Sequence, residues 1–126
     1  MTALSDWHAM MHGSDYSGLS TLVAEGAVFE SPVVHTPQVG KAITEKYLAA
    51  AMSLLNNGSF SYLGEWHTEG SAVLEFSCVL DGVAVNGVDM IWWNADQKIT
   101  RFKVMVRPLK AINMLHQKMG ELLARA

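Results

Sequence analysis

Apolar and polar residues alternate with a period of two from residue 59 to residue 107, which is typical of strands with one buried face. The pattern predicts strands at 59–68, 71–80, 83–93 and 99–109, with a turn at 94–98 between the last two. Glu69-Gly70 and Asp81-Gly82 separate the first three strands, and Asp-Gly is a strong signal for a two-residue hairpin turn. We therefore predict an antiparallel meander in the second half of the chain.

In the first half, apolar residues recur every three to four positions, as on one face of a helix. We predict helices at 4–13, from 14 or 15 to 26, and at 41–56, with Ser5 or Asp6 capping the first. A short strand at 27–31 ends at Pro32, and 33–39 is expected to be an ordered loop. The inner faces of the second and third helices are predicted to hold Leu19, Leu22 and Val23, and Ile43, Tyr47, Ala50, Ala51, Leu54 and Leu55, respectively.

The final segment, 109–126, is predicted to be an amphipathic helix that docks on the rest of the protein. Its inner side would carry Leu109, Ile112, Leu115, His116, Met119, Leu122 and Leu123. Helices come first, then the meander, then this last helix, and 126 residues suffice for one core. We therefore predict a single α+β domain, 1–126, in which a curved antiparallel sheet wraps around N-terminal helices.

Asp89 is the one carboxylate among apolar residues and Gly on one face of the strand 83–93. A two-residue turn at Asp81-Gly82 places Phe76 opposite Gly87 and Leu74 opposite Asp89, on the core face. An acid there is costly unless it is hydrogen-bonded, neutralised or wet, and burial would raise its pKa toward neutrality. Asp89 is therefore either a general base in an apolar pocket or a structural acid.

The register of the strand 59–68 leaves two alternatives open. If Glu69-Gly70 is a two-residue turn, Glu65 and His67 lie on the inner face, with Glu65 opposite Leu74. If the turn is longer, Tyr62 and Trp66 lie inside and Glu65 lies outside. His67, and His35 on the Pro-flanked loop, are either acid–base partners or exposed histidines.

The outer face of the predicted sheet carries an unusual number of apolar residues. Val73, Val79, Val88, Met90 and Trp92 would meet water in a monomer. A patch of this kind usually marks an interface, which predicts a homodimer through the back of the sheet.

Composition excludes several classes of protein. A net charge of -3 and a pI near 5.9, with scattered Lys and Arg, argue against a nucleic-acid surface. No apolar run reaches membrane-spanning length, and the N-terminus lacks the pattern of a signal peptide, so we expect a soluble cytoplasmic protein. Cys78 is alone, and His8 and His12 lack a third ligand, so we predict no metal. No Gly-rich phosphate loop follows a strand, and we predict no cofactor.

Four short stretches resemble the nuclear transport factor 2-like superfamily: 14–19 running into 27–32, 39–43 with 47–48, 87–89 with 98–99, and 107–109. Members include SnoaL-type polyketide cyclases, ketosteroid isomerase and limonene epoxide hydrolase. The resemblance implies a cone-shaped α+β fold, a pocket between the concave sheet and the N-terminal helices, and often dimers. It also implies a pocket acid used as base beside a carbonyl, and Asp89 matches that role best. The hydrolase pattern needs two acids that bracket an Arg, and Arg101 and Arg107 are expected to point away from the core, which argues against a hydrolase.

The sequence thus predicts a pocket for a small hydrophobic carbonyl compound, used by a cofactor-independent isomerase, cyclase or lyase. The candidate catalytic residues are Asp89, His67 and Glu65. The candidate ligand-binding residues are Phe29, His35, Tyr47, Phe60, Trp66, Phe76, Ile91, Trp93 and Val104. A non-catalytic module that binds a hydrophobic ligand, and an interaction domain using the back of the sheet, are the alternatives.

Overall fold

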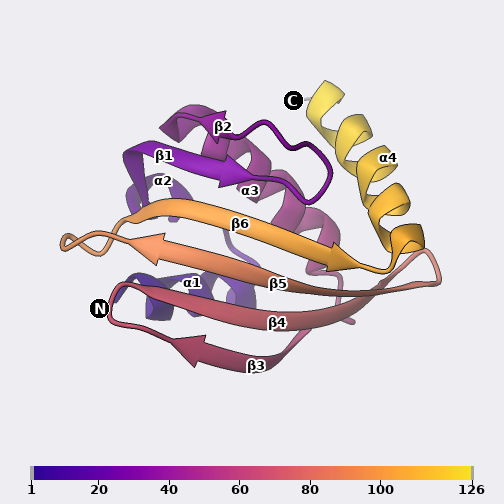
Figure 1. Ribbon diagram of the computed structural model, residues 1–126, viewed down its shortest axis with the longest axis horizontal. Helices are drawn as coiled ribbons and strands as arrows, with labels where there is room; N and C mark the ends of the chain where they lie inside the picture. The colour runs from indigo at the N-terminus through magenta and orange to yellow at the C-terminus, as the bar shows by residue number, and fades with distance from the viewer. Residues whose placement is uncertain (1, 126) are drawn as a thin grey trace.

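The computed structural model describes residues 2–125 and shows a six-stranded sheet with four helices (Figure 1). The helices are α1 (Ala3–Gly13), α2 (Leu19–Leu22), α3 (Lys41–Leu55) and α4 (Leu109–Arg125). The strands are β1 (Val23–Glu30), β2 (Gln38–Val39), β3 (Ser61–His67), β4 (Ser71–Leu80), β5 (Val83–Trp93) and β6 (Ile99–Arg107), in the spatial order β2-β1-β6-β5-β4-β3. The three N-terminal helices lie on one face of the sheet, and α4 stands at one end.

The predicted α+β architecture is confirmed, with one difference in strand direction. The β3–β6 meander and the β1–β2 pair are antiparallel, whereas β1 and β6 pair in parallel. Two strands joined by a tight turn must run antiparallel, but β1 and β6 are far apart in the sequence, so no turn restricts their direction. No helix of residues 2–125 is long and apolar enough to cross a membrane.

The first two helices differ from the prediction at their ends. The Thr2 hydroxyl caps α1 by accepting from the backbone N–H of Ser5, so neither Ser5 nor Asp6 is the cap. The expected second helix shrinks to the four residues of α2, and Val23 already begins β1. Val23 pairs with Ile99 of β6, and this long-range pairing overrides the local helical pattern.

The helix α3 has nearly its predicted bounds, but a different face is buried. Its fully buried residues are Thr44, Leu48, Met52 and Leu55, of which only Leu55 was in the predicted set. Thr44 is satisfied there, because its hydroxyl donates to the carbonyl oxygen of Ala27 at 3.0 Å. On α4, Ala111 and Leu115 are buried, whereas Leu109, predicted on the inner side, is exposed.

The predicted hairpin of β4 and β5 is confirmed residue by residue, including Phe76 opposite Gly87 and Leu74 opposite Asp89. Leu74 and Phe76 are fully buried in the core. Gly87 has to be glycine, because a Cβ at this position would lie 2.6 Å from the Phe76 ring and from the carbonyl oxygen of Met105. This well-packed pair of strands holds Asp89 in a defined place on the inner face.

Candidate functional site

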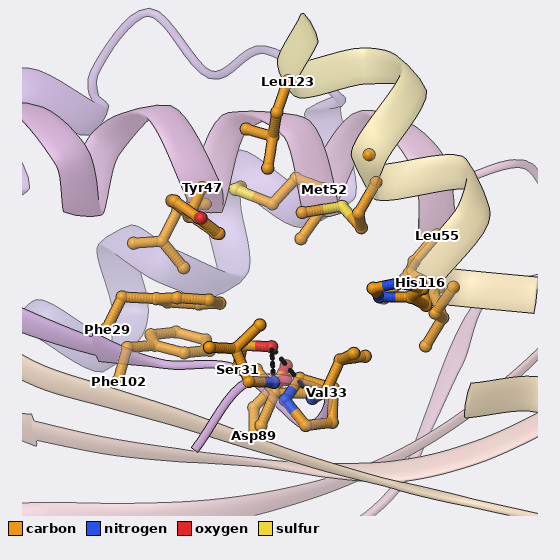
Figure 2. A pocket seen from close by; sticks show the side chains of 18 of the residues that line it. Phe29, Ser31, Val33, Tyr47, Met52, Leu55, Asp89, Phe102, His116 and Leu123 are labelled. Atoms are coloured by element: carbon orange, nitrogen blue, oxygen red, sulfur yellow. Dashed lines mark hydrogen bonds between the residues drawn. The ribbon is translucent and has the colours of Figure 1, made fainter. Parts of the chain in front are cut away.

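A cavity of about 240 Å³ lies between the inner face of the sheet, α3, α4 and the loop that follows β1 (Figure 2). Asp89 lies at its floor, while Tyr47 and Met52 reach in from α3 and His116 and Leu123 from α4. Other residues that line the cavity are Trp7, Phe29, Ser31, Phe60, Phe102, Val104, Met119 and Gly120. The cavity is therefore apolar almost throughout, with one carboxyl group.

The loop after β1 is held in shape by Ser31. Its hydroxyl accepts hydrogen bonds from the backbone N–H groups of Val33, at 2.9 Å, and Val34, at 3.2 Å. This arrangement is typical of Ser in a turn, and it forms the wall beside Asp89 in Figure 2.

Asp89 is only 6% exposed and pairs with Leu74 on one side and Val104 on the other. The Tyr62 hydroxyl donates to its Oδ2 at 2.8 Å, and the Trp7 indole N–H donates to the Tyr62 oxygen at 2.9 Å. Among the described residues, no fully enclosed side-chain oxygen or nitrogen lacks a partner, and Oδ1 makes no such hydrogen bond. Oδ1 is therefore the polar atom that Asp89 presents to the cavity.

Burial raises the pKa of Asp89 to about 7, although the hydrogen bond from Tyr62 acts in the opposite direction. Burial also raises the pKa of the Tyr62 hydroxyl, and the neighbouring Asp89 raises it further. Tyr62 therefore stays protonated, and its hydroxyl donates a hydrogen bond to Asp89. The result is a carboxyl group that both loses and regains a proton readily near neutral pH.

A β-bulge in β3 explains why both Tyr62 and Glu65 turn to the inner face. Glu65 pairs with Leu74 as the two-residue turn requires, but the register shifts at Leu63, so Tyr62 pairs with Phe76. Each of the two predicted alternatives is therefore correct in part. Trp66 pairs with Val73 on the outer side and is 59% exposed, so its predicted place inside is wrong.

Glu65 and His67, the other two candidate catalytic residues, do not line the cavity. The Glu65 carboxylate contacts the Nε2 atoms of both His8 and His67 at the open edge of the sheet. Burial disfavours ionisation of Glu65, but the hydrogen bonds to His8 and His67 outweigh it and hold its pKa below the ordinary value. This cluster ties α1 to β3 and lies apart from the apolar floor.

Of the nine predicted ligand-binding residues, Phe29, Tyr47, Phe60 and Val104 line the cavity. The other five do not, for three different reasons. Phe76 and Ile91 are fully enclosed in the core, and Trp93 packs against its edge. His35 lines a second hollow, formed by the loop after β1 and by β6, and Trp66 lies on the outer face.

The prediction omitted the contribution of α4 to the site. His116 points into the cavity and Gly120 lines it, next to Met119 and Leu123. The apolar face of the segment included His116, which was a usable signal, but where the helix docks was not predictable from its own pattern. Within residues 2–125, no cluster of three or more His, Cys, Asp or Glu is placed to hold a metal ion.

No protein-family model and no curated protein matches the chain. Among solved structures, a steroid delta-isomerase from Pseudomonas aeruginosa is 34% identical, with a TM-score of 0.92, over 98% of this chain and 90% of that one. A bacterial protein with a cystatin-like fold from Silicibacter pomeroyi is 24% identical (TM-score 0.85; 94% and 83% covered). An NTF2-like protein of unknown function from Mesorhizobium loti is 18% identical (TM-score 0.72; 84% and 88% covered).

Proposed function

The chain belongs to the nuclear transport factor 2-like superfamily, and we propose that it is a cofactor-independent isomerase, cyclase or lyase with Asp89 as general base. Its substrate is a small hydrophobic carbonyl compound. The observation that carries this proposal is the open Oδ1 of Asp89 at the floor of an apolar cavity. The 34% identity to a steroid delta-isomerase supports the isomerase reading of the reaction.

The proposed chemistry is a proton transfer next to a carbonyl group. Ionised Asp89 takes a proton from the carbon beside the carbonyl through Oδ1, and the C–H electron pair moves toward the carbonyl oxygen to form an enolate. The neutral acid then returns the proton to a different carbon, which regenerates the carboxylate. A pKa of about 7 suits both halves of this cycle, because the group is a usable base and a usable acid at neutral pH.

The walls of the cavity support the same reading. Phe29, Phe102 and Tyr47 form adjoining rings, with centroids 6.3 Å apart for Phe29–Phe102 and 5.3 Å apart for Phe29–Tyr47. Such walls exclude water and strengthen electrostatic interactions inside the site. We assign His116 as the hydrogen-bond donor to the carbonyl oxygen of the substrate. Its ring nitrogens point into the cavity from α4, whereas Asp89 lies at the floor.

The test compares Asp89→Asn with Glu65→Gln, which changes an acid in the same row of the sheet but outside the cavity. Small cyclic enones and ketones are screened by ultraviolet absorbance and by deuterium incorporation from D₂O. We expect Asp89→Asn to lower turnover at least ~100-fold with little change in affinity, and Glu65→Gln to leave turnover nearly unchanged. Ligand binding without turnover or exchange, with affinity equal in Asp89→Asn, would instead identify a non-catalytic binding module.

We also propose a homodimer through the outer face of the sheet. Val79, Met105 and Trp66 are exposed there, and Trp92 is only partly covered, by the Arg101 guanidinium 4.5 Å from its ring. A second copy would cover this apolar surface. Analytical ultracentrifugation at micromolar concentration should show a dimer, and a monomer alone would end this part of the proposal.

A further inference from the structure

Trp7, Tyr62 and Asp89 form a chain of hydrogen bonds whose direction is set by chemistry. The indole N–H of Trp7 can only donate, so the Tyr62 oxygen must accept from it, at 2.9 Å. The Tyr62 hydroxyl then donates its hydrogen bond to Oδ2 of Asp89, at 2.8 Å. When Asp89 is neutral, its own proton is therefore placed on Oδ1, the oxygen open to the cavity.

We propose that Trp7 and Tyr62 are positioning residues that turn Oδ1 of Asp89 toward the cavity and make it the oxygen that exchanges a proton with the ligand. The exchange itself rests on the proposed function, whereas the positioning of the carboxyl group is a property of the ligand-free protein. Neither residue removes a proton from the substrate. Both act through Asp89.

The two residues are held rigidly enough for this role. Trp7 is fully buried on α1, and its ring packs on Phe102 with centroids 4.8 Å apart. The Tyr62 ring lies between the edge contacts of Phe60, at 5.0 Å, and His8, at 5.5 Å. The bulge in β3 brings Tyr62 to the inner face in the first place. The hydroxyl thus has a defined position beneath the carboxylate, as preorganised catalysis requires.

The electrostatic role of Tyr62 has a clear sign. Its hydrogen bond favours the ionised form of Asp89 and works against burial, so removal of the hydroxyl must raise the pKa of Asp89 further. The adjacent strands contribute only Leu74 and Val104 opposite Asp89. Among the titratable groups of the surrounding elements, Tyr62 on β3 is hydrogen-bonded to Asp89, and Tyr47 on α3 and His116 on α4 line the cavity, whereas Glu65 on β3 and His8 on α1 contact each other outside the cavity lining.

The experiment is a carbon-13 NMR titration of the Asp89 carboxyl group in the ligand-free protein and in Tyr62→Phe, which keeps the ring. We expect the titration midpoint to rise by about one to two pH units in Tyr62→Phe. The control is Tyr16→Phe, because the Tyr16 hydroxyl also bonds inside the protein, to Asn56, but lies outside the cavity lining. The control should leave the midpoint unchanged. An unshifted midpoint in folded Tyr62→Phe would overturn the proposal.

A second variant, Trp7→Phe, removes the indole donor while keeping an aromatic ring. The Tyr62 oxygen is then free to accept a hydrogen bond from neutral Asp89, so the midpoint should rise again, by less than in Tyr62→Phe. A fall, or a rise as large as in Tyr62→Phe, would contradict the two-step chain.

The pH profile of kcat/KM separates this proposal from the proposed function. In Tyr62→Phe, the apparent pKa of the rise in kcat/KM at low pH should increase by the same amount as the NMR midpoint. The plateau value of kcat/KM at high pH should be largely kept. Turnover with an unchanged apparent pKa would overturn the positioning role and leave the general base in place. A shifted NMR midpoint without turnover on any carbonyl compound would support the positioning of Asp89 and count against the proposed reaction.

Discussion

Glu65 on β3 and Asp89 on β5 flank Leu74 in one row of the sheet, yet the fold shifts the pKa values of the two carboxyl groups in opposite directions. The Glu65 side chain is 32% exposed at the sheet edge, and two histidines hold its pKa below 4.5. Asp89 is buried at the floor of the cavity with one tyrosine donor, and burial raises its pKa to about 7. Only β4 lies between a carboxylate with a structural role and one that can transfer a proton.

The comparison shows what each place in the sheet permits. At the edge, histidine side chains from α1 and β3 satisfy a partly exposed carboxylate, which stabilises the fold. On the inner face, neighbours are apolar and the remaining oxygen faces a cavity, so the carboxylate costs free energy and becomes available to a ligand.

The largest expected effect is a gain of stability in Asp89→Asn. Because the pKa of Asp89 is about 7 when folded and 3.8 ordinarily, ionisation opposes folding increasingly as pH rises from about 4 to 7. Asn cannot ionise and can still accept from Tyr62. Urea denaturation should therefore show Asp89→Asn more stable than wild type by about 4 kcal/mol at pH 8, and by almost nothing at pH 4. Equal stabilities at pH 8 would contradict a buried, costly carboxylate.

The next effect is the pH dependence of turnover. Only ionised Asp89 can act as base, so kcat/KM should rise about 100-fold between pH 5 and pH 9 and level off above pH 8. Glu65→Gln should give the same midpoint as wild type, because Glu65 lies outside the cavity. A profile that is flat from pH 5 to pH 9, or one whose midpoint moves in Glu65→Gln, would show that Asp89 is not the base.

A smaller effect is expected from filling the cavity beside Asp89. Gly120 of α4 lines the cavity, and a Cβ built there meets no atom within 4 Å. Gly120→Leu should therefore weaken binding of the neutral dye N-phenyl-1-naphthylamine about tenfold, while Gly120→Ala, the matched control, changes it much less. Fluorescence titration measures both. Unchanged binding in Gly120→Leu would place the dye elsewhere.

The smallest effect concerns the edge carboxylate. The lowered pKa of Glu65 means that its ion pairs stabilise the fold above about pH 4.5 and lose that effect as pH falls below this value. Glu65→Gln should therefore cost about 0.5–1 kcal/mol at pH 7 and less at pH 3. Denaturation at both pH values checks the sign, and a cost that is undiminished at pH 3 would mean that packing, not charge, is lost.

The place of Asp89 in this comparison could be predicted from sequence, because the relevant signals are local. Asp81-Gly82 specifies a two-residue turn, and alternation then determines every pair of β4 and β5, including Leu74 with Asp89. A cavity was expected because the chain resembles a cone-shaped family. The pairing of Glu65 with Leu74 followed from a two-residue turn at Glu69-Gly70, which was one of the two alternatives that the sequence left open.

The rest of the site depends on long-range packing, which leaves little trace in local pattern. The bulge at Leu63 shifts the alternation of side chains along β3 by one residue. Tyr62 therefore lies on the inner face, where it is hydrogen-bonded to Asp89. Residues of α1 and α4, including Trp7 and His116, reach the cavity only because those helices dock where they do. Periodicity shows which face of a helix is apolar, but not what that face covers.

The most direct test of the account is a carbon-13 NMR titration of the side-chain carboxyl groups in the wild-type protein. The account predicts that the Asp89 signal titrates near pH 7, while the Glu65 signal titrates below pH 4.5. If the Asp89 signal instead titrates near pH 3.8, the carboxyl group is well solvated or strongly hydrogen-bonded, and the proposal of a general base tuned to neutral pH is contradicted.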